Sequence, residues 1–147
     1  MSPSKDKVLT SKPGVDRLWA VGPGIIRGVM HGPLENKSNS KVIVRIRGRW
    51  TMVQGPEVVK YSERFEFAVW GSLRNIHPLP DDAKLYFKAT VYQENMLRDL
   101  DAELLPDLLQ RNKIIKNDRA IWKKDYERKI DRENPRVEFE VGVIDAH

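Results

Sequence analysis

The run KLYFKATVY, residues 84–92, does most to limit the folds open to this chain. It is dense in aromatic and β-branched residues, which pack well on a pleated sheet, so it predicts a buried strand. The segment before it, residues 55–74, places apolar residues such as Val58, Phe65 and Val69 at helical spacing and predicts an amphipathic helix. Strands and helices therefore mix without a regular βαβ alternation, and we expect an α+β or mixed α/β fold.

The composition of the chain predicts an N-terminal tail followed by one domain. Its 147 residues suit one domain with a single core. We expect residues 1–24, which are rich in Ser, Lys, Pro and Gly, to form a flexible tail, and residues 25–147 to form the domain. The first strand of that domain is expected to end at the Gly32-Pro33 turn.

Three later segments also predict strands. Apolar and basic residues alternate over residues 41–53, which predicts one strand with Arg45 and Arg47 on the same face. Residues 121–130 and 136–144 flank the turn-forming sequence DRENP. We expect these last two strands to form an antiparallel pair.

Charge and composition narrow the class of partner. The whole chain carries +5 and residues 1–50 carry +7, so the other 97 residues carry −2. This asymmetry predicts a surface attracted to phosphates, with acidic groups elsewhere. The absence of cysteine excludes a disulfide framework and a cysteine zinc site. With no run of about 20 apolar residues and no secretory signal, we expect a cytoplasmic protein with no membrane partner.

Acidic residues gather in RDLDAELLPDLLQRNKIIKNDRAIW, residues 98–122. If its start is extended, Asp99 and Asp101 point to one side while Leu100 points into the core. Asp118 directly precedes the next predicted strand, where a third carboxylate would complete a pocket for Mg²⁺, which prefers oxygen ligands. The alternative is that Asp101 caps a helix and the other two acids occupy the surface and a turn.

The segments RDLD (98–101), LLPDLLQ (104–110) and KIIKNDRAIW (113–122) resemble the RusA-type Holliday-junction resolvases, small nucleases typical of phages and prophages. That family has an R-D-x-D core, then an apolar helix, then a short acidic segment before a strand. The order of the upstream strand, basic stretch and tyrosine-bearing helix is also similar. The resemblance covers roughly residues 25–141.

This resemblance implies a compact domain with a small mixed sheet packed by two main helices. It also implies a structure-selective DNA endonuclease of recombination and repair, acting as a homodimer on branched DNA such as the Holliday junction. Asp99, Asp101 and Asp118 would be its catalytic acids and would bind Mg²⁺, with Mn²⁺ as a substitute. Two sites related by a two-fold axis suit paired nicks in a four-way junction.

Several positions depart from the family pattern, among them the first member of its usual Asp-Asp pair, which is Asn117 here. The family's Asn after the second aspartate is Ala102 here, and its Lys three residues further on is Leu105. These departures leave open a catalytically weakened or inactive nucleic-acid-binding protein on the same scaffold. A third alternative is an unrelated basic structural protein in which the acids are caps and turns.

Basic residues fall in two groups, one in the first 50 residues and one around the acids. Phosphate contacts from such residues give affinity with little sequence information. The residues that we expect to bind DNA are Lys37, Lys41, Arg45, Arg47, Arg49, Arg98, Lys116 and Arg119. Trp50, Trp70 and Trp122 are predicted to be core or dimer-interface residues rather than base-stacking platforms.

Overall fold

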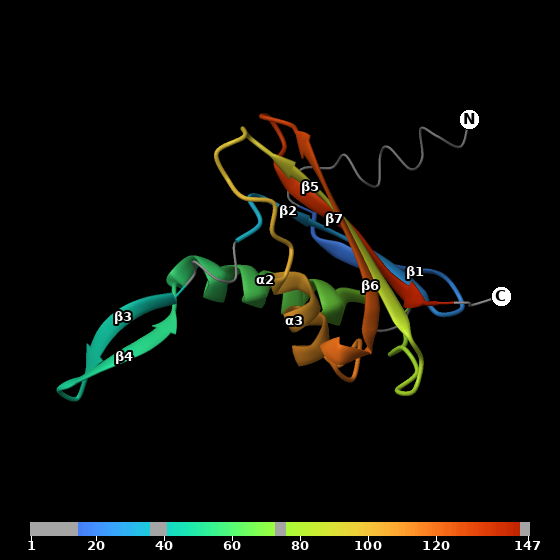
Figure 1. Cartoon of the computed structure of the whole chain (residues 1–147), viewed down its shortest axis with the longest axis horizontal. Coiled ribbons are helices and arrows are strands. Elements are labelled where there is room, and N and C mark those ends of the chain that lie inside the picture. The colour runs from blue at the N-terminus through green and yellow to red at the C-terminus, as the bar shows by residue number, and fades with distance from the viewer. Residues whose placement is uncertain (1–14, 36–40, 73–75, 145–147) are drawn as a thin grey trace.

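The computed structural model describes residues 15–35, 41–72 and 76–144. A five-stranded mixed sheet with the strand order β1-β2-β7-β5-β6 is accompanied by a separate two-stranded sheet, β3-β4, and by two helices (Figure 1). The strands are β1 (Arg17–Gly22), β2 (Ile25–His31), β3 (Lys41–Ile46), β4 (Arg49–Gln54), β5 (Leu85–Gln93), β6 (Ile121–Ile130) and β7 (Arg136–Val143). The helices are α2 (Pro56–Ser72) and α3 (Leu104–Arg111), and a 3-10 turn, η1, spans Asp118–Ala120. The expected α+β class is confirmed.

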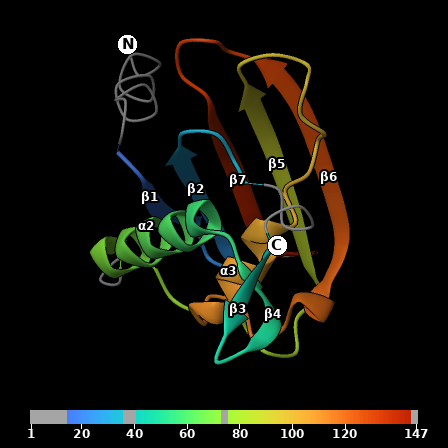
Figure 2. The same cartoon turned by 90° about the vertical axis from the view of Figure 1, so that its left-hand side faces the viewer.

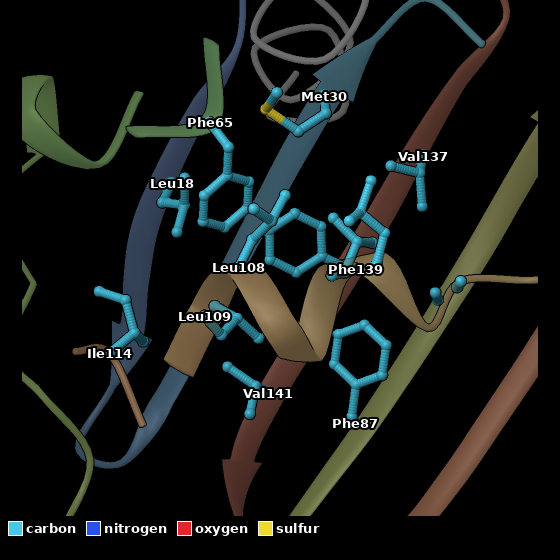
Figure 3. Close-up of a cluster of buried hydrophobic side chains, with 14 of the residues drawn as sticks. Leu18, Met30, Phe65, Phe87, Leu108, Leu109, Ile114, Val137, Phe139 and Val141 are labelled. Carbon is cyan, nitrogen blue, oxygen red and sulfur yellow. The ribbon is translucent and has the colours of Figure 1, made fainter. Parts of the chain in front are cut away.

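Both helices pack on the same face of the large sheet, with α2 over β1 and β2 and α3 in front of β7 (Figure 2). Phe65 of α2 stacks on Phe139 of β7, with 6.1 Å between ring centroids. Phe87 of β5 lies at the same centroid distance on the other side of Phe139. Leu108 of α3 joins this buried cluster (Figure 3). The core therefore fixes α3, and with it the loops at both ends of α3, against the sheet.

A glycine makes room for the central ring of this core. Gly28 of β2 pairs with Phe139 across the strands. A Cβ atom at Gly28 would lie 2.3 Å from Cζ of Phe139, which is less than any real non-bonded carbon contact. The ring therefore lies directly on the Gly28 backbone, and no larger residue fits there without displacing it.

The opposite face of the sheet carries charged residues in register. Asp125 of β6, Lys88 of β5, Glu140 of β7 and Arg27 of β2 are successive cross-strand partners. Nε of Arg27 lies 2.6 Å from Oε1 of Glu140, and Nζ of Lys88 lies 3.7 Å from Oε2. Opposite charges on neighbouring strands stabilise the pairing on this face, which neither described helix covers.

Tyr86 on the same face gives a stability change at alkaline pH. Its hydroxyl donates to Oε2 of Glu140 at 2.5 Å. Burial, followed by this hydrogen bond, raises the pKa of Tyr86 from 10.0 to about 12. The folded-state pKa is the higher one, so its stabilisation is complete below pH 10 and is lost as the pH rises through about 12. We expect the urea midpoint of Tyr86→Phe to fall less between pH 9 and pH 12 than that of the wild type; equal falls would contradict this.

The expected tail boundary at residue 24 is wrong, because Arg17–Gly22 forms edge strand β1 and pairs with β2. Asp16 explains how this segment is held. Its Oδ1 accepts the backbone N–H of His31 at 2.6 Å, and its Oδ2 accepts Nη1 of Arg64 at 2.9 Å. One carboxylate thus ties the start of β1 to the end of β2 and to α2. Residues 1–14 lie outside the described part of the chain.

The single strand expected over residues 41–53 is a hairpin instead. β3 and β4 pair antiparallel, and Arg47 and Gly48 form the turn between them with φ angles of 50° and 80°. Two consecutive positive φ angles are typical of the tight hairpin turn whose twist matches the strands. Arg47 therefore lies in the turn and does not share a strand face with Arg45.

The expected antiparallel pairing of the last two strands is also wrong. Both strands exist, but β5 lies between them and pairs antiparallel with β7 and parallel with β6. A parallel connection requires a crossover, and the chain makes it through residues 94–120, which include α3. This crossover carries all three predicted catalytic acids.

Candidate active site

The loop after β5 returns along the edge strand β6 and is fixed by two buried or half-buried side chains. Nε2 of Gln93 donates to the carbonyl of Asp99 at 3.2 Å. Nη2 of Arg128 donates to the carbonyl of Arg98 at 2.9 Å. Leu100 packs against the core while the Asp99 side chain is exposed. The predicted directions of Leu100, toward the core, and of Asp99, toward solvent, are confirmed, whereas Asp101 is half-buried.

A second set of contacts anchors the end of this loop. Oδ1 of Asp101 accepts the backbone N–H of Glu103 at 2.8 Å, so Asp101 does form the turn that leads into α3. Oε1 of Glu103 lies 2.7 Å from Nζ of Lys124 on β6, and the Tyr126 hydroxyl donates to Oε2 of Glu103. Burial raises the pKa of Tyr126, and the hydrogen bond to Glu103 and the charges of Glu103 and Asp101 add to the effect. Tyr126 therefore stays protonated as a donor to Glu103.

Asp118 lies toward the other end of α3. Its backbone N–H donates to Oε1 of Gln110 at 2.9 Å, while Asn117 caps η1 by accepting the N–H of Arg119. The eight residues of α3 give it a length of ~12 Å at about 1.5 Å per residue. α3 therefore separates Asp118 from the loop that carries Asp99 and Asp101. Within residues 15–35, 41–72 and 76–144, no group of three or more His, Cys, Asp or Glu side chains is placed to hold a metal ion.

Two of the positions that depart from the family pattern are part of the core. Ala102 and Leu105 are both fully buried, at 0% exposure. A polar side chain at either position would lose its water without a matching partner, so the packing explains the apolar residues. α3 begins at Leu104, and Pro106 lies in its first turn, where the missing N–H costs little.

The predicted DNA-binding residues are divided between two places. Arg45 and Arg49 lie exposed on the β3-β4 hairpin, with Arg47 in its turn. Arg98, Lys116 and Arg119 lie near the acids. Lys37 and the side chain of Lys41 are outside the described part of the structure.

The three basic residues near the acids differ in their contacts. Nη1 of Arg98 donates to the carbonyl of Leu34 at 3.1 Å, so Arg98 also holds the chain after β2. Nζ of Lys116 lies 3.7 Å from Oδ2 of Asp81, and both side chains are largely exposed. Arg119 is exposed beside Asp118. Lys116 and Arg119 are therefore the better placed of the three to meet a phosphate.

Sequence reasoning missed Lys124 and Tyr126. Alternation along β6 puts these two side chains on the face that the returning loop covers, together with Arg128. The i, i+2 spacing of Lys124, Tyr126 and Arg128 in the predicted strand could have indicated that these polar side chains share one face. Lys124 brings a positive charge to Glu103, two residues after Asp101, from a different segment than the family pattern would.

Searches against models of known protein families and against curated proteins found no match. Among the helices that the structure describes, none is both long and apolar enough to cross a membrane.

Proposed function

We propose that this protein is a Mg²⁺-dependent, structure-selective DNA endonuclease of the RusA type, which resolves four-way junctions by paired nicks as a homodimer in the cytoplasm. The observation that carries the proposal is the anchored loop at β6. Gln93 and Arg128 hold its backbone, and Leu100 holds it to the core. Asp99 is exposed, and Asp101 is half-buried in the turn before α3.

The residues present fit magnesium in their chemistry. Asp99, Asp101 and Asp118 offer hard carboxylate oxygens, and they would hold the ion together with substrate phosphate and water. When bound, Mg²⁺ activates the attacking water and offsets charge on the phosphate. The proposal requires Asp118, which α3 holds apart from Asp99 and Asp101, to come within reach of an ion shared with that pair. Lys124, Lys116 and Arg119 would then offset phosphate charge around it.

One observation favours a second candidate, a nucleic-acid-binding protein without cleavage activity. α3 holds Asp118 apart from Asp101, and Asp101 already serves as a turn acceptor. A protein that retained the basic residues but could no longer bind the metal ion would have this arrangement of acids. The two candidates differ in cleavage and agree in binding.

The test incubates the protein with an end-labelled four-way junction and, separately, with a linear duplex of the same sequence. With Mg²⁺ we expect symmetric nicks in two opposing strands of the junction and an intact duplex; with chelator both should remain whole. Binding of the junction without nicks at any Mg²⁺ or Mn²⁺ concentration would reject the endonuclease in favour of the second candidate.

Replacing Lys116 and Arg119 together with Gln should weaken junction binding and its salt dependence. Each phosphate contact contributes about 0.9 to the slope of log K against log salt, so loss of both should reduce the slope by ~1.8. Fluorescence anisotropy over a salt series measures it. The matched control is Lys123→Gln with Lys129→Gln, two exposed lysines on the opposite face of β6. An equal reduction in the control would show that general charge, not this site, binds the DNA.

A further inference from the structure

The β3-β4 hairpin projects from the start of α2, away from the large sheet (Figures 1 and 2). Both of its faces carry large apolar side chains. Ile43 pairs with Met52 on one face, and their exposures are 64% and 61%. Val42 pairs with Val53 on the other face, where Ile46 is also exposed. An isolated two-stranded hairpin is marginally stable in water, so this arrangement needs a covering surface.

Trp50 at the hairpin is 72% exposed, and Trp70 of α2 is 71% exposed. The expectation that they are core residues is therefore wrong, as it is for Trp122, which is 67% exposed, and the expectation of an interface stays a prediction. The guanidinium of Arg45 lies 5.8 Å from the centroid of the Trp50 ring, most of which stays exposed.

One side of α2 carries an exposed stripe of apolar and acidic residues, which complements the apolar and basic hairpin. Val59, Glu63, Phe67 and Trp70 are spaced four, four and three residues apart, so they lie on one side of the helix, and Glu66 adjoins them. Phe67 is 82% exposed. This side of α2 faces away from the core and combines three large apolar side chains with two carboxylates.

Charge and length match between the two surfaces. The hairpin, residues 41–54, contains four Lys or Arg and no Asp or Glu, whereas the α2 stripe contains acids. The six-residue strands extend ~20 Å, and the stripe from Val59 to Trp70 extends ~17 Å along the helix. The hairpin leads directly into α2, so it extends beyond its own helix rather than over it.

We propose that two copies of this chain exchange hairpins, each β3-β4 hairpin lying along the exposed stripe of the partner's α2. The arrangement is isologous: the same two surfaces meet twice across a two-fold axis, which closes the assembly as a dimer. Ile43, Trp50 and Met52 are covered by Phe67 and Trp70 of the partner, and Arg45 of the same hairpin face meets Glu63 and Glu66. The inference rests on the homodimer of the proposed function and names its interface.

The absence of native cysteine allows a direct test. The variant with Met52→Cys and Phe67→Cys is treated with a short bis-maleimide, which tolerates a small error in register, and is analysed on a denaturing gel. We expect a covalent species of twice the 17.1-kDa chain mass in most of the protein. The matched control pairs Met52→Cys with Thr90→Cys on the uncovered face of the sheet and should remain monomeric on the gel. Equal cross-linking of both pairs, or of neither, overturns the interface.

Charge exchange provides a second, non-covalent test by sedimentation. Arg45→Glu, on the hairpin face that the partner covers, should raise the dimer dissociation constant on the order of tenfold, because like charges then meet. Adding Glu63→Arg and Glu66→Arg to the same chain should restore the dimer. A dimer dissociation constant that stays the same after both changes overturns the inference. A junction-cleaving dimer without the cross-link rejects the interface alone, whereas a cross-linked dimer that never cleaves rejects the proposed function alone.

Discussion

Asp101→Asn should abolish Mg²⁺-dependent cleavage of a four-way junction, with a rate lower by ~10³-fold, which corresponds to about 4 kcal/mol of transition-state stabilisation. The change removes a negative charge and one oxygen ligand. The amide oxygen of Asn still accepts the Glu103 N–H as a turn residue, so folding should be retained. Asp118→Asn should have a loss of similar size. Single-turnover nicking of a labelled junction measures both.

The matched control for these variants is Asp125→Asn. Asp125 is exposed on β6 but lies on the opposite face of the sheet, in register with Lys88. Its cleavage rate should stay within about twofold of the wild type, since Asp125 is exposed on the sheet face away from Lys124 and Tyr126. Junction binding should be retained in all three variants. If Asp101→Asn cleaves as fast as Asp125→Asn, the acids are turn residues and the proposed chemistry is wrong.

Gly28→Ala should lower the free energy of unfolding by about 3 kcal/mol, the upper end for overpacking a close-packed core. The new Cβ would meet Cζ of Phe139 at 2.3 Å, and that ring is itself held between Phe65 and Phe87. Because neither neighbour leaves space, the ring or the strand backbone has to shift. Urea unfolding followed by tryptophan fluorescence measures the loss.

Gly71→Ala is the control, because a Cβ there meets nothing within 4 Å. It lies in the last turn of α2, where alanine stabilises a helix relative to glycine by up to about 1 kcal/mol. Adding Phe139→Leu to Gly28→Ala should recover part of the loss by shortening the side chain on the glycine. A Gly28→Ala protein as stable as the wild type would show that Phe139 does not lie on this backbone.

The sequence predicted the elements whose pattern is local. The helical spacing of Val58, Phe65 and Val69 and the aromatic density of residues 84–92 lie within single elements, and both were confirmed as α2 and β5. The pairing of β6 was missed because insertion of β5 between β6 and β7 is a long-range choice that no local pattern records. The hairpin was missed because Arg47-Gly48 lacks the Asn or Asp that usually marks such a turn.

The candidate site was predictable to the same degree. The alternation of Asp99, Leu100 and Asp101 predicts which side chains face the core. Leu100 and Asp99 follow it, whereas Asp101 is half-buried in the turn before α3. The separation of Asp118 from that pair was not predictable, because it depends on where α3 begins and how it packs. Lys124 reaches Glu103 only through the parallel pairing of β5 and β6, which the sequence did not reveal.

Binding of Mn²⁺ to the isolated protein, counted by electron paramagnetic resonance, tests the central claim most directly, because it asks whether the acids share an ion without requiring DNA. We expect saturable binding by the wild type and by Asp125→Asn, competition by Mg²⁺, and loss of binding in Asp101→Asn and in Asp118→Asn. Binding that survives both of these substitutions, or no saturable binding by the wild type, would contradict a metal site formed by Asp99, Asp101 and Asp118.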